Sequence, residues 1–240
     1  MRDFAEGEVL AFDKPLHWTS FDLVAKVRYA LCRLLGTKKL KVGHTGTLDP
    51  LATGVVIVCT GKKTKMIDRL QYEAKEYEAT LQLGATTPSY DMEKEVDATY
   101  PTAHITRQLI DTTIPQFVGE QWQVPPMFSA VQINGHRAYE LARKGESVAL
   151  KPKLLKIDEI EVLDFDAETM QLTIRVVCSK GTYIRALARD IGERLNSGAY
   201  LTALRRTRVG ETRVEDCMTI EAFLCQLDIH PENDRSSETR

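Results

Sequence analysis

The sequence of 240 residues lacks the features that mark many cofactor, metal and membrane proteins. Its five cysteines are widely spaced and include no C-x-x-C pair, so neither a zinc site nor a redox-active dithiol is indicated. The glycine-rich fingerprints G-x-G-x-x-G and G-x-x-x-x-G-K-[ST] are absent, which argues against a nucleotide cofactor. No apolar run reaches the roughly 18 residues of a membrane span, and the acidic start is unlike a signal peptide. We therefore expect a cytoplasmic protein without metal or cofactor, whose cysteines are buried, reduced thiols.

Charge is distributed unevenly, although the formal net charge is only −2. Residues 25–75 contain eleven lysines and arginines against three acidic residues, whereas residues 211–240 contain eight acidic residues against three basic ones. A local basic surface is enough to follow an RNA phosphate backbone. Ordinary solvated lysines would give the same counts, so charge alone leaves both interpretations open.

Hydrophobic periodicity indicates both strands and helices. Alternation or continuous burial predicts strands at 9–12, 55–59, 77–83, 172–178 and, as a strand edge, 201–209. Apolar stripes and capping residues predict helices from Thr19-Ser20 to before Gly36, and at 104–118, 138–144, 182–195 (with Thr182 as N-cap) and 219–227. The three glycines and one proline of residues 41–54 predict an irregular loop.

The order of these elements predicts the class of fold. Helices and strands alternate irregularly, with hairpin turns such as Asn134-Gly135 as well as helical connections. This order favours an α+β fold, with a mixed, mostly antiparallel sheet flanked by helices, over a doubly wound parallel sheet. We expect one domain over residues 1–228 and a disordered tail at 229–240.

The loop at 41–54 has the composition of a reactive site. His44 and Asp49 lie between glycines, and Pro50 fixes the backbone directly after the carboxylate. Such loops can present a side chain rigidly. Taken alone, however, Asp49 is equally explained as a residue that closes a turn, and His44 as an ordinary hydrogen-bonding histidine.

This loop, GHTGTLDPLATG, resembles the catalytic motif of the TruB family of pseudouridine synthases. Further blocks resemble the family in the same order: DKP (13–15), KEYEATLQLG (75–84), PPMFSA (125–130), AYELARKGE (138–146), CSKGTYIR (178–185) and LRR (204–206). The resemblance implies the pseudouridine synthase fold, with a central catalytic cleft that binds RNA. It also implies conversion of a uridine in the T-loop of tRNA, at position 55, to pseudouridine.

The resemblance assigns catalytic roles to three residues. Asp49 matches the nucleophile, which attacks the target nucleoside so that the uracil can detach, rotate and rejoin through C5. Arg185 matches the arginine that pairs with this carboxylate. Tyr77 matches the tyrosine that stacks on the target base and is the candidate base for the C5 proton. Without the resemblance, Arg185 would be interpreted as a surface residue and Tyr77 as part of the core.

Three further residues are expected to bind the substrate. By resemblance, His44 enters the RNA loop and keeps the target base extruded, while Tyr183 and Leu204 form the base pocket. Lys14 is expected to give structural support or to contact a phosphate. The implied partner is the T-stem-loop of tRNA, and we expect a monomer that needs neither cofactor, metal ion nor protein partner.

The sequence departs from the family pattern at three places. Residues 85–94 lack the usual Thr-Asp pairs, which leaves that loop without an assigned role, and His17 stands where the family usually has glycine. About 30 residues follow the LRR block, too few for the family's usual C-terminal PUA domain.

Other functions remain open from the sequence. The chain could be an RNA chaperone that folds tRNA without turnover, or a guide-dependent pseudouridine synthase, although the latter normally needs the PUA domain. A metal-dependent hydrolase ranks last, because no His, Asp and Glu cluster has the spacing of metal ligands.

Overall fold

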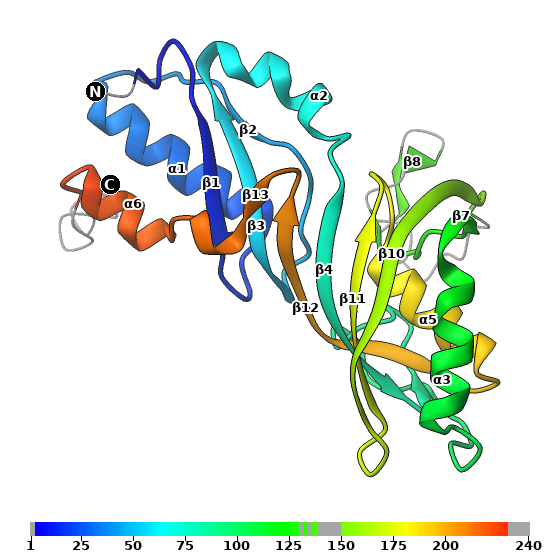
Figure 1. The fold of residues 1–240 in the computed structure, drawn as a ribbon. Helices are drawn as coiled ribbons and strands as arrows, with labels where there is room; N and C mark the ends of the chain where they lie inside the picture. The colour runs from blue at the N-terminus through cyan, green and yellow to red at the C-terminus, as the bar shows by residue number, and fades with distance from the viewer. Residues whose placement is uncertain (1–2, 130–131, 134–135, 139–149, 230–240) are drawn as a thin grey trace. The chain divides into compact units, whose positions relative to one another are not determined.

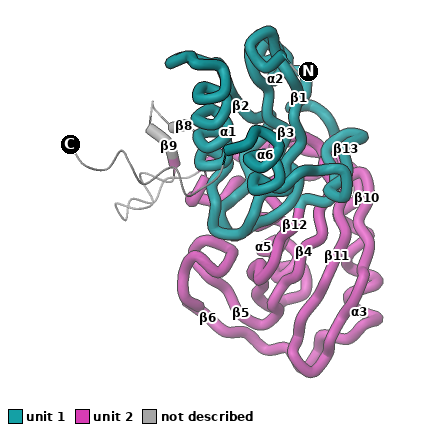
Figure 2. Tube along the Cα trace, turned by 90° about the vertical axis from the view of Figure 1, so that its left-hand side faces the viewer, with its two compact units in different colours: residues 1–73, 206–240 teal, residues 74–205 magenta. Residues whose placement is uncertain are grey.

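The computed structural model describes residues 3–129, 132–133, 136–138 and 150–229 (Figure 1). Over this part of the chain, helices accompany a mostly antiparallel sheet, which confirms the predicted α+β fold. No helix of the described residues is long and apolar enough to cross a membrane. The chain divides into two compact units, residues 1–73 with 206–240 (unit 1) and residues 74–205 (unit 2) (Figure 2).

The sheet of unit 1 is centred on a strand that is buried at every residue except Thr53. β3 (Ala52–Thr60) contains the predicted run VVIVC and pairs in antiparallel fashion with β1 (Val9–Lys14) and with β2 (Val42–His44). The last residues of β12 (Ala199–Val209) and β13 (Thr212–Arg213) complete it. The expected strands at 9–12 and 55–59 are therefore confirmed.

Helices α1 (Ser20–Leu34) and α6 (Ile220–Gln226) cover this sheet (Figure 1). Both begin after a threonine N-cap, which was predicted for α1, whereas the helix at 219–227 was predicted without a cap. The Phe223 ring of α6 packs edge-on against Phe12 of β1, with ring centroids 5.2 Å apart. Leu34, expected in the apolar stripe of α1, is instead 47 % exposed, whereas Leu31 in the same turn is completely buried. A 3-10 helix, η1 (Gly61–Met66), and α2 (Ile67–Leu70) follow β3.

The prediction that residues 41–54 are irregular throughout was wrong at both ends. Residues 42–44 form β2, and residues 52–54 belong to β3, where Gly54 pairs with Lys14 of β1. Glycine lowers strand propensity, but backbone pairing with a neighbouring strand outweighs that preference here. The irregular part is therefore shorter, from residue 45 to residue 51.

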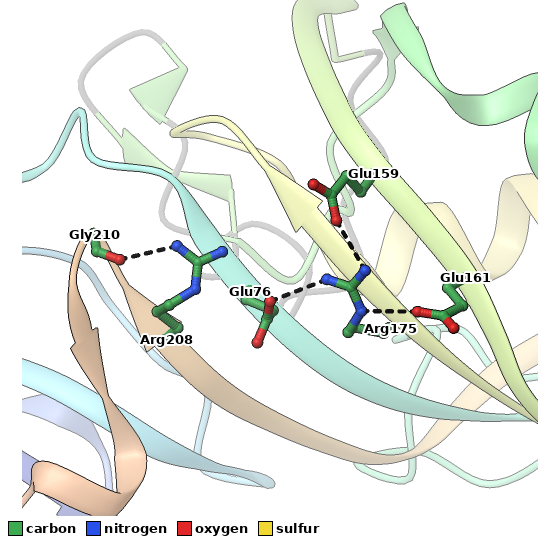
Figure 3. A network of polar contacts seen from close by, with 6 residues as sticks. All are labelled: Glu76, Glu159, Glu161, Arg175, Arg208 and Gly210. Carbon is green, nitrogen blue, oxygen red and sulfur yellow. Dashed lines mark hydrogen bonds and ion pairs between the residues drawn. The ribbon is translucent and has the colours of Figure 1, made fainter.

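The sheet of unit 2 has the strand order β12, β4, β11, β10 and β7. β4 (Lys75–Leu83) and β11 (Gln171–Cys178) have the predicted alternation, and β10 (Lys153–Asp166) joins β11 to β7 (Gly119–Gln123). On one face Arg175 of β11 binds three carboxylates, those of Glu76, Glu159 and Glu161 (Figure 3). This arginine ties three neighbouring strands together. The expectation that β12 is an edge was wrong, because it neighbours β3, β4 and β13.

The helices of unit 2 include α5 (Ile184–Arg194), which carries the predicted buried stripe. Its N-cap is Tyr183 rather than the expected Thr182, because the Thr182 hydroxyl donates to the Ser179 carbonyl instead. The region predicted as helix at 104–118 is α3 (Arg107–Thr113) followed by the 3-10 helix η2 (Ile114–Phe117). Short strand pairs β5 (Ala85–Thr86) with β6 (Ala98–Thr99), and β8 (Gln132–Ile133) with β9 (His136–Arg137), complete the unit.

Some expectations fall outside the described residues. They are the turn at 134–135, the predicted helix at 138–144 beyond its first residue, and the tail after residue 229. The assignment of residues 1–228 to one domain stays a prediction. Of the cysteines, Cys59 and Cys178 are buried as expected, whereas Cys225 is exposed.

Candidate active site

Asp49 lies half-buried on the short loop between β2 and β3, in unit 1. On one side of it, the hydroxyl of Ser20 accepts from the Leu48 N–H at 2.8 Å and donates to the Leu48 carbonyl at 3.2 Å. On the other side, the Pro50 carbonyl accepts from the His17 N–H at 2.8 Å. The backbone around the candidate nucleophile is therefore held from both directions.

His17 makes this contact with a φ of 65°, in the left-handed region that glycine adopts most easily. This conformation accounts for the glycine that the family usually has at this place. Histidine is among the residues that tolerate it best, at a modest cost in free energy.

Lys14 is completely buried beneath the same loop. Its Nζ donates to the carbonyls of Pro15 and Trp18, at 2.8 and 2.7 Å, and so fixes the turn that carries His17. Burial lowers the pKa of Lys14 to about 8, an effect that the negative charge of Asp49 opposes and the positive charge of Arg206 reinforces. Two roles were expected for Lys14, structural support or a phosphate contact. The expected phosphate contact was wrong, because the side chain has no exposed surface.

Arg206 is a second buried cation in unit 1, with 3 % of its surface exposed. Its Nε donates to the Val55 carbonyl at 2.6 Å, Nη1 to the Thr47 carbonyl at 3.3 Å and Nη2 to the Gly46 carbonyl at 3.2 Å. One guanidinium thus binds the backbone both before and after Asp49. The LRR block was noted in the sequence, but periodicity does not show that its last arginine points inward.

His44, at the end of β2, is half-buried in unit 1. Burial lowers the pKa of His44 below 6.5, and the positive charge of Arg206 lowers it further. Both effects favour the neutral form of the imidazole. A neutral ring can contact a nucleobase by stacking without the cost of desolvating a charge.

Arg185, in the first turn of α5, is a buried cation of unit 2, with 5 % of its surface exposed. Its Nη1 donates to the Ser89 carbonyl at 3.2 Å and its Nη2 to the Phe128 carbonyl at 2.9 Å, while Nε lies 3.6 Å from Asp91 Oδ2. Asp91 is itself buried. Asp91 was not predicted as a site residue, because it lies in the loop 85–94, to which the sequence assigned no role. A buried arginine needs a carboxylate partner, and this requirement was the signal that could have pointed to Asp91.

The other expected site residues of unit 2 lie on its sheet and at the start of α5. Tyr77 is 8 % exposed on β4, opposite Val176, so its ring points inward as predicted. The side chain of Gln123 binds both the N–H and the carbonyl of Tyr183, at 2.9 and 3.2 Å. Leu204 is half-buried on β12. Gln123 was not expected, and its role as a backbone clamp leaves no sequence pattern.

The six expected site residues are divided between the units. Asp49 and His44 belong to unit 1, where they share the region of Lys14 and Arg206, and the remaining residues belong to unit 2. The expected pairing of Asp49 with Arg185 stays a prediction. Within the described part of the chain, no group of three His, Cys, Asp or Glu residues could hold a metal ion.

Two solved structures of complexes between Cbf5 and Nop10 contain a chain with a similar fold. The match to "Crystal structure of the archaeal box H/ACA sRNP Nop10-Cbf5 complex" has a TM-score of 0.66 and 26 % identity, covering 96 % of this chain and 56 % of that one. "Crystal Structure of a Cbf5-Nop10-Gar1 Complex" matches with a TM-score of 0.67 and 28 % identity, over 95 % and 58 %. This chain spans a little over half the length of those chains. The fold is that of the pseudouridine synthases.

Family models and relatives indicate one particular family among the pseudouridine synthases. The model of the TruB family pseudouridylate synthase N-terminal domain matches residues 33–184, and that of the tRNA pseudouridylate synthase B C-terminal domain matches residues 185–238. The "tRNA pseudouridine synthase B" of Phocaeicola vulgatus is 66 % identical over 94 % of this chain and 95 % of that protein. The protein of the same name from Flavobacterium johnsoniae is 51 % identical over 92 % and 96 %. The chain belongs to the TruB family of pseudouridine synthases.

Proposed function

We propose that this chain isomerises uridine to pseudouridine in the T-loop of tRNA, at position 55, with Asp49 as the nucleophile. Relatives named tRNA pseudouridine synthase B reach 66 % identity over nearly their whole length, whereas the proteins of guide-RNA complexes reach 26–28 % over about half of theirs. This difference supports tRNA as the substrate and action without a guide RNA or protein partner. The two buried cations beside the Asp49 loop are the observation that carries the proposal.

The proposed chemistry conserves every atom of the substrate. The Asp49 carboxylate attacks the nucleoside, the bond between N1 and C1′ breaks, and the detached uracil rotates. A bond then forms between C5 and C1′, and the bond between Asp49 and the nucleoside breaks, which regenerates the free carboxylate. The proton on C5 leaves, and N1 gains a proton. No redox step occurs, so the reaction requires no cofactor.

In this proposal, the residues of unit 2 pair with the charged nucleophile, accept a proton and line the base pocket. Arg185 pairs with the nucleophile, and its contacts to Ser89, Phe128 and Asp91 support a fixed guanidinium. Tyr77 stacks on the target base and accepts the C5 proton. Tyr183 and Leu204 line the base pocket.

The proposal also requires that the target base leaves the RNA stack. The reacting atoms of a stacked T-loop uridine are not accessible to a carboxylate. The lowered pKa of His44 supports its entry into the RNA loop as a neutral ring that keeps the base extruded.

Replacing Asp49 with Asn tests the proposal. The amide is nearly isosteric but not nucleophilic, so we expect no detectable pseudouridine while tRNA binding stays within about threefold. The measurement is mapping of pseudouridine in unmodified tRNA after incubation with metal-free protein and chelator. Asp68→Asn, which changes an exposed carboxylate on α2 of the same unit, is the matched control.

The same assay separates the alternatives. Turnover by Asp49→Asn above a few per cent of the wild-type rate contradicts the assignment of the nucleophile. A wild-type protein that refolds tRNA but forms no pseudouridine is a chaperone. A wild-type protein that acts only when a guide RNA is added belongs to the guide-dependent class.

A further inference from the structure

Arg206 connects the two ends of the loop that carries Asp49. Its Nη1 and Nη2 bind the carbonyls of Thr47 and Gly46, which precede Asp49, while its Nε binds the carbonyl of Val55, which follows it. The Ser20 hydroxyl holds Leu48 but does not reach the segment after Asp49. Arg206 therefore fixes the separation of the two loop ends.

The choice of arginine at this buried position needs an explanation. Burying a charge is costly, and an apolar side chain of similar volume would avoid that cost. The hydrogen bonds that Arg206 makes to the described residues are to carbonyl oxygens, which are neutral acceptors and offset the burial of the charge only in part. What arginine provides is a rigid planar fork with donors on three nitrogens, which can bind backbone from two segments at once.

Gly54 indicates that the backbone is also built around Arg206. This glycine of β3 has a φ of 110°, and a side chain there would collide with the backbone carbonyl of Arg206. The absence of a side chain allows β12 to approach closely at this residue. The close approach brings the guanidinium to Val55, the next residue of β3.

We propose that Arg206 is a positioning residue for the reaction, which sets the geometry of the Asp49 loop by clamping its two ends. This inference rests on the proposed function, because it assumes that Asp49 is the nucleophile. Arg206 acts through the backbone and does not touch the substrate. Its loss should therefore slow the chemical step and leave tRNA affinity nearly unchanged.

Two substitutions separate the clamp from the charge. Arg206→Met keeps much of the apolar volume and removes every donor, whereas Arg206→Lys keeps the positive charge but replaces the fork with one nitrogen. A displacement of about 1 Å at a reacting group can cost on the order of a hundredfold in rate. We expect single-turnover rates about a hundredfold lower for Arg206→Met and at least about tenfold lower for Arg206→Lys, with tRNA dissociation constants within about threefold of wild type.

Arg175→Met is the matched control. Arg175 also binds three acceptors (Figure 3), but it lies on the face of the unit 2 sheet opposite to Tyr77, because Arg175 pairs with Glu78 and Val176 pairs with Tyr77. Its loss should lower the melting temperature and leave the single-turnover rate of the folded enzyme within about threefold of wild type.

Several results would overturn the inference. Rates within about threefold of wild type for Arg206→Lys would mean that charge, not the clamp, is required. A parallel loss of affinity would give Arg206 a binding role, and failure of both variants to fold would give it a purely structural one. Asp49→Asn, assayed alongside, keeps the two proposals apart: if it remains active, the assignment of the nucleophile fails, whatever the Arg206 variants do.

Discussion

At the scale of single residues, unit 1 holds two buried cations close to one carboxylate. Lys14 and Arg206 both bind carbonyl oxygens. The positive charge of Arg206 also lowers the pKa of Lys14 and that of His44. Fully buried lysines are rare because desolvation disfavours the charged form. The lowered pKa of Lys14 is the measurable sign of that cost.

The stability of the protein should depend on pH through Lys14. The folded pKa is about 8 and the ordinary value is 10.5, so the unfolded chain binds more protons between these values. The free energy of unfolding should therefore gain a contribution as pH rises through this window, on the order of 3 kcal/mol in full. Comparing urea unfolding of wild type and Lys14→Met at pH 7.5 and pH 10 isolates this residue. A difference that does not grow with pH would contradict the lowered pKa.

Tyr77→Phe distinguishes stacking from proton transfer. Phenylalanine keeps the ring of a residue that is 8 % exposed and removes only the hydroxyl. General-base catalysis contributes about 10² to 10⁴ in rate, whereas one modest hydrogen bond contributes about 1 kcal/mol, or about fivefold. We expect normal tRNA binding and a single-turnover rate at least about a hundredfold lower, stalled after glycosidic cleavage. A loss below about tenfold would leave Tyr77 as a stacking platform.

At the scale of elements, the start of α1 is stabilised by a capping box next to the site. The Thr19 side chain accepts from the Asp22 N–H, and the Asp22 carboxylate accepts from the Thr19 N–H. In α3 the corresponding Thr106 accepts only from the Leu109 N–H. Two reciprocal hydrogen bonds should contribute more than one.

Thr19→Ala should therefore destabilise its helix more than Thr106→Ala does. We expect a loss of about 1 to 2 kcal/mol for Thr19→Ala, toward the upper part of the range for N-caps, and of about 0.5 to 1 kcal/mol for Thr106→Ala. Amide hydrogen exchange in the first two turns of α1 and α3 measures each helix separately. Equal losses would show that the reciprocal bond from Asp22 adds nothing.

An element could be predicted from the sequence when the residues that determine its structure lie within the element itself. The strands β4 and β11 follow from alternation, and α1 follows from its cap and apolar stripe, because these signals lie within each segment. β2 was missed because three residues that include Gly43 carry no periodicity and owe their conformation to pairing with β3.

The candidate site shows the same limit. The resemblance supplied Asp49, Tyr77 and Arg185, but it gave no reason to single out Asp91 or Arg206. Asp91 matters because it contacts Arg185 from 94 positions earlier in the chain. In β12 the buried positions include both Leu201 and Arg206, which differ in parity, so alternation does not predict that Arg206 points inward.

At the scale of the whole molecule, affinity for RNA should depend on salt. Lys63 and Lys65 of η1 are exposed, whereas Lys62 is bound to Glu6 at 2.8 Å. Each lysine that meets a phosphate contributes about 0.7 to 0.9 to the slope of log affinity against log salt. The double variant Lys63→Ala, Lys65→Ala should therefore reduce the slope by about 1.4 to 1.8, and Lys62→Ala by less.

The control for this prediction lies in unit 2. Lys151 and Lys153 are equally exposed but fall outside the basic segment 25–75. Replacing both by alanine should leave the slope unchanged. If instead this pair alters the slope and the η1 pair does not, the RNA follows a different surface from the one we expect.

The connectivity of unit 1 has a consequence for the order in which the protein is made. Unit 2 is a continuous stretch that is complete once residue 205 has been synthesised, but unit 1 joins the first 73 residues to those from 206 onward. Chains emerge from the ribosome at about 5 to 20 residues per second, so Asp49 leaves several seconds before Arg206. During that interval its loop lacks the Gly46, Thr47 and Val55 contacts that Arg206 supplies. A nascent chain halted before residue 206 therefore carries the candidate nucleophile without its clamp.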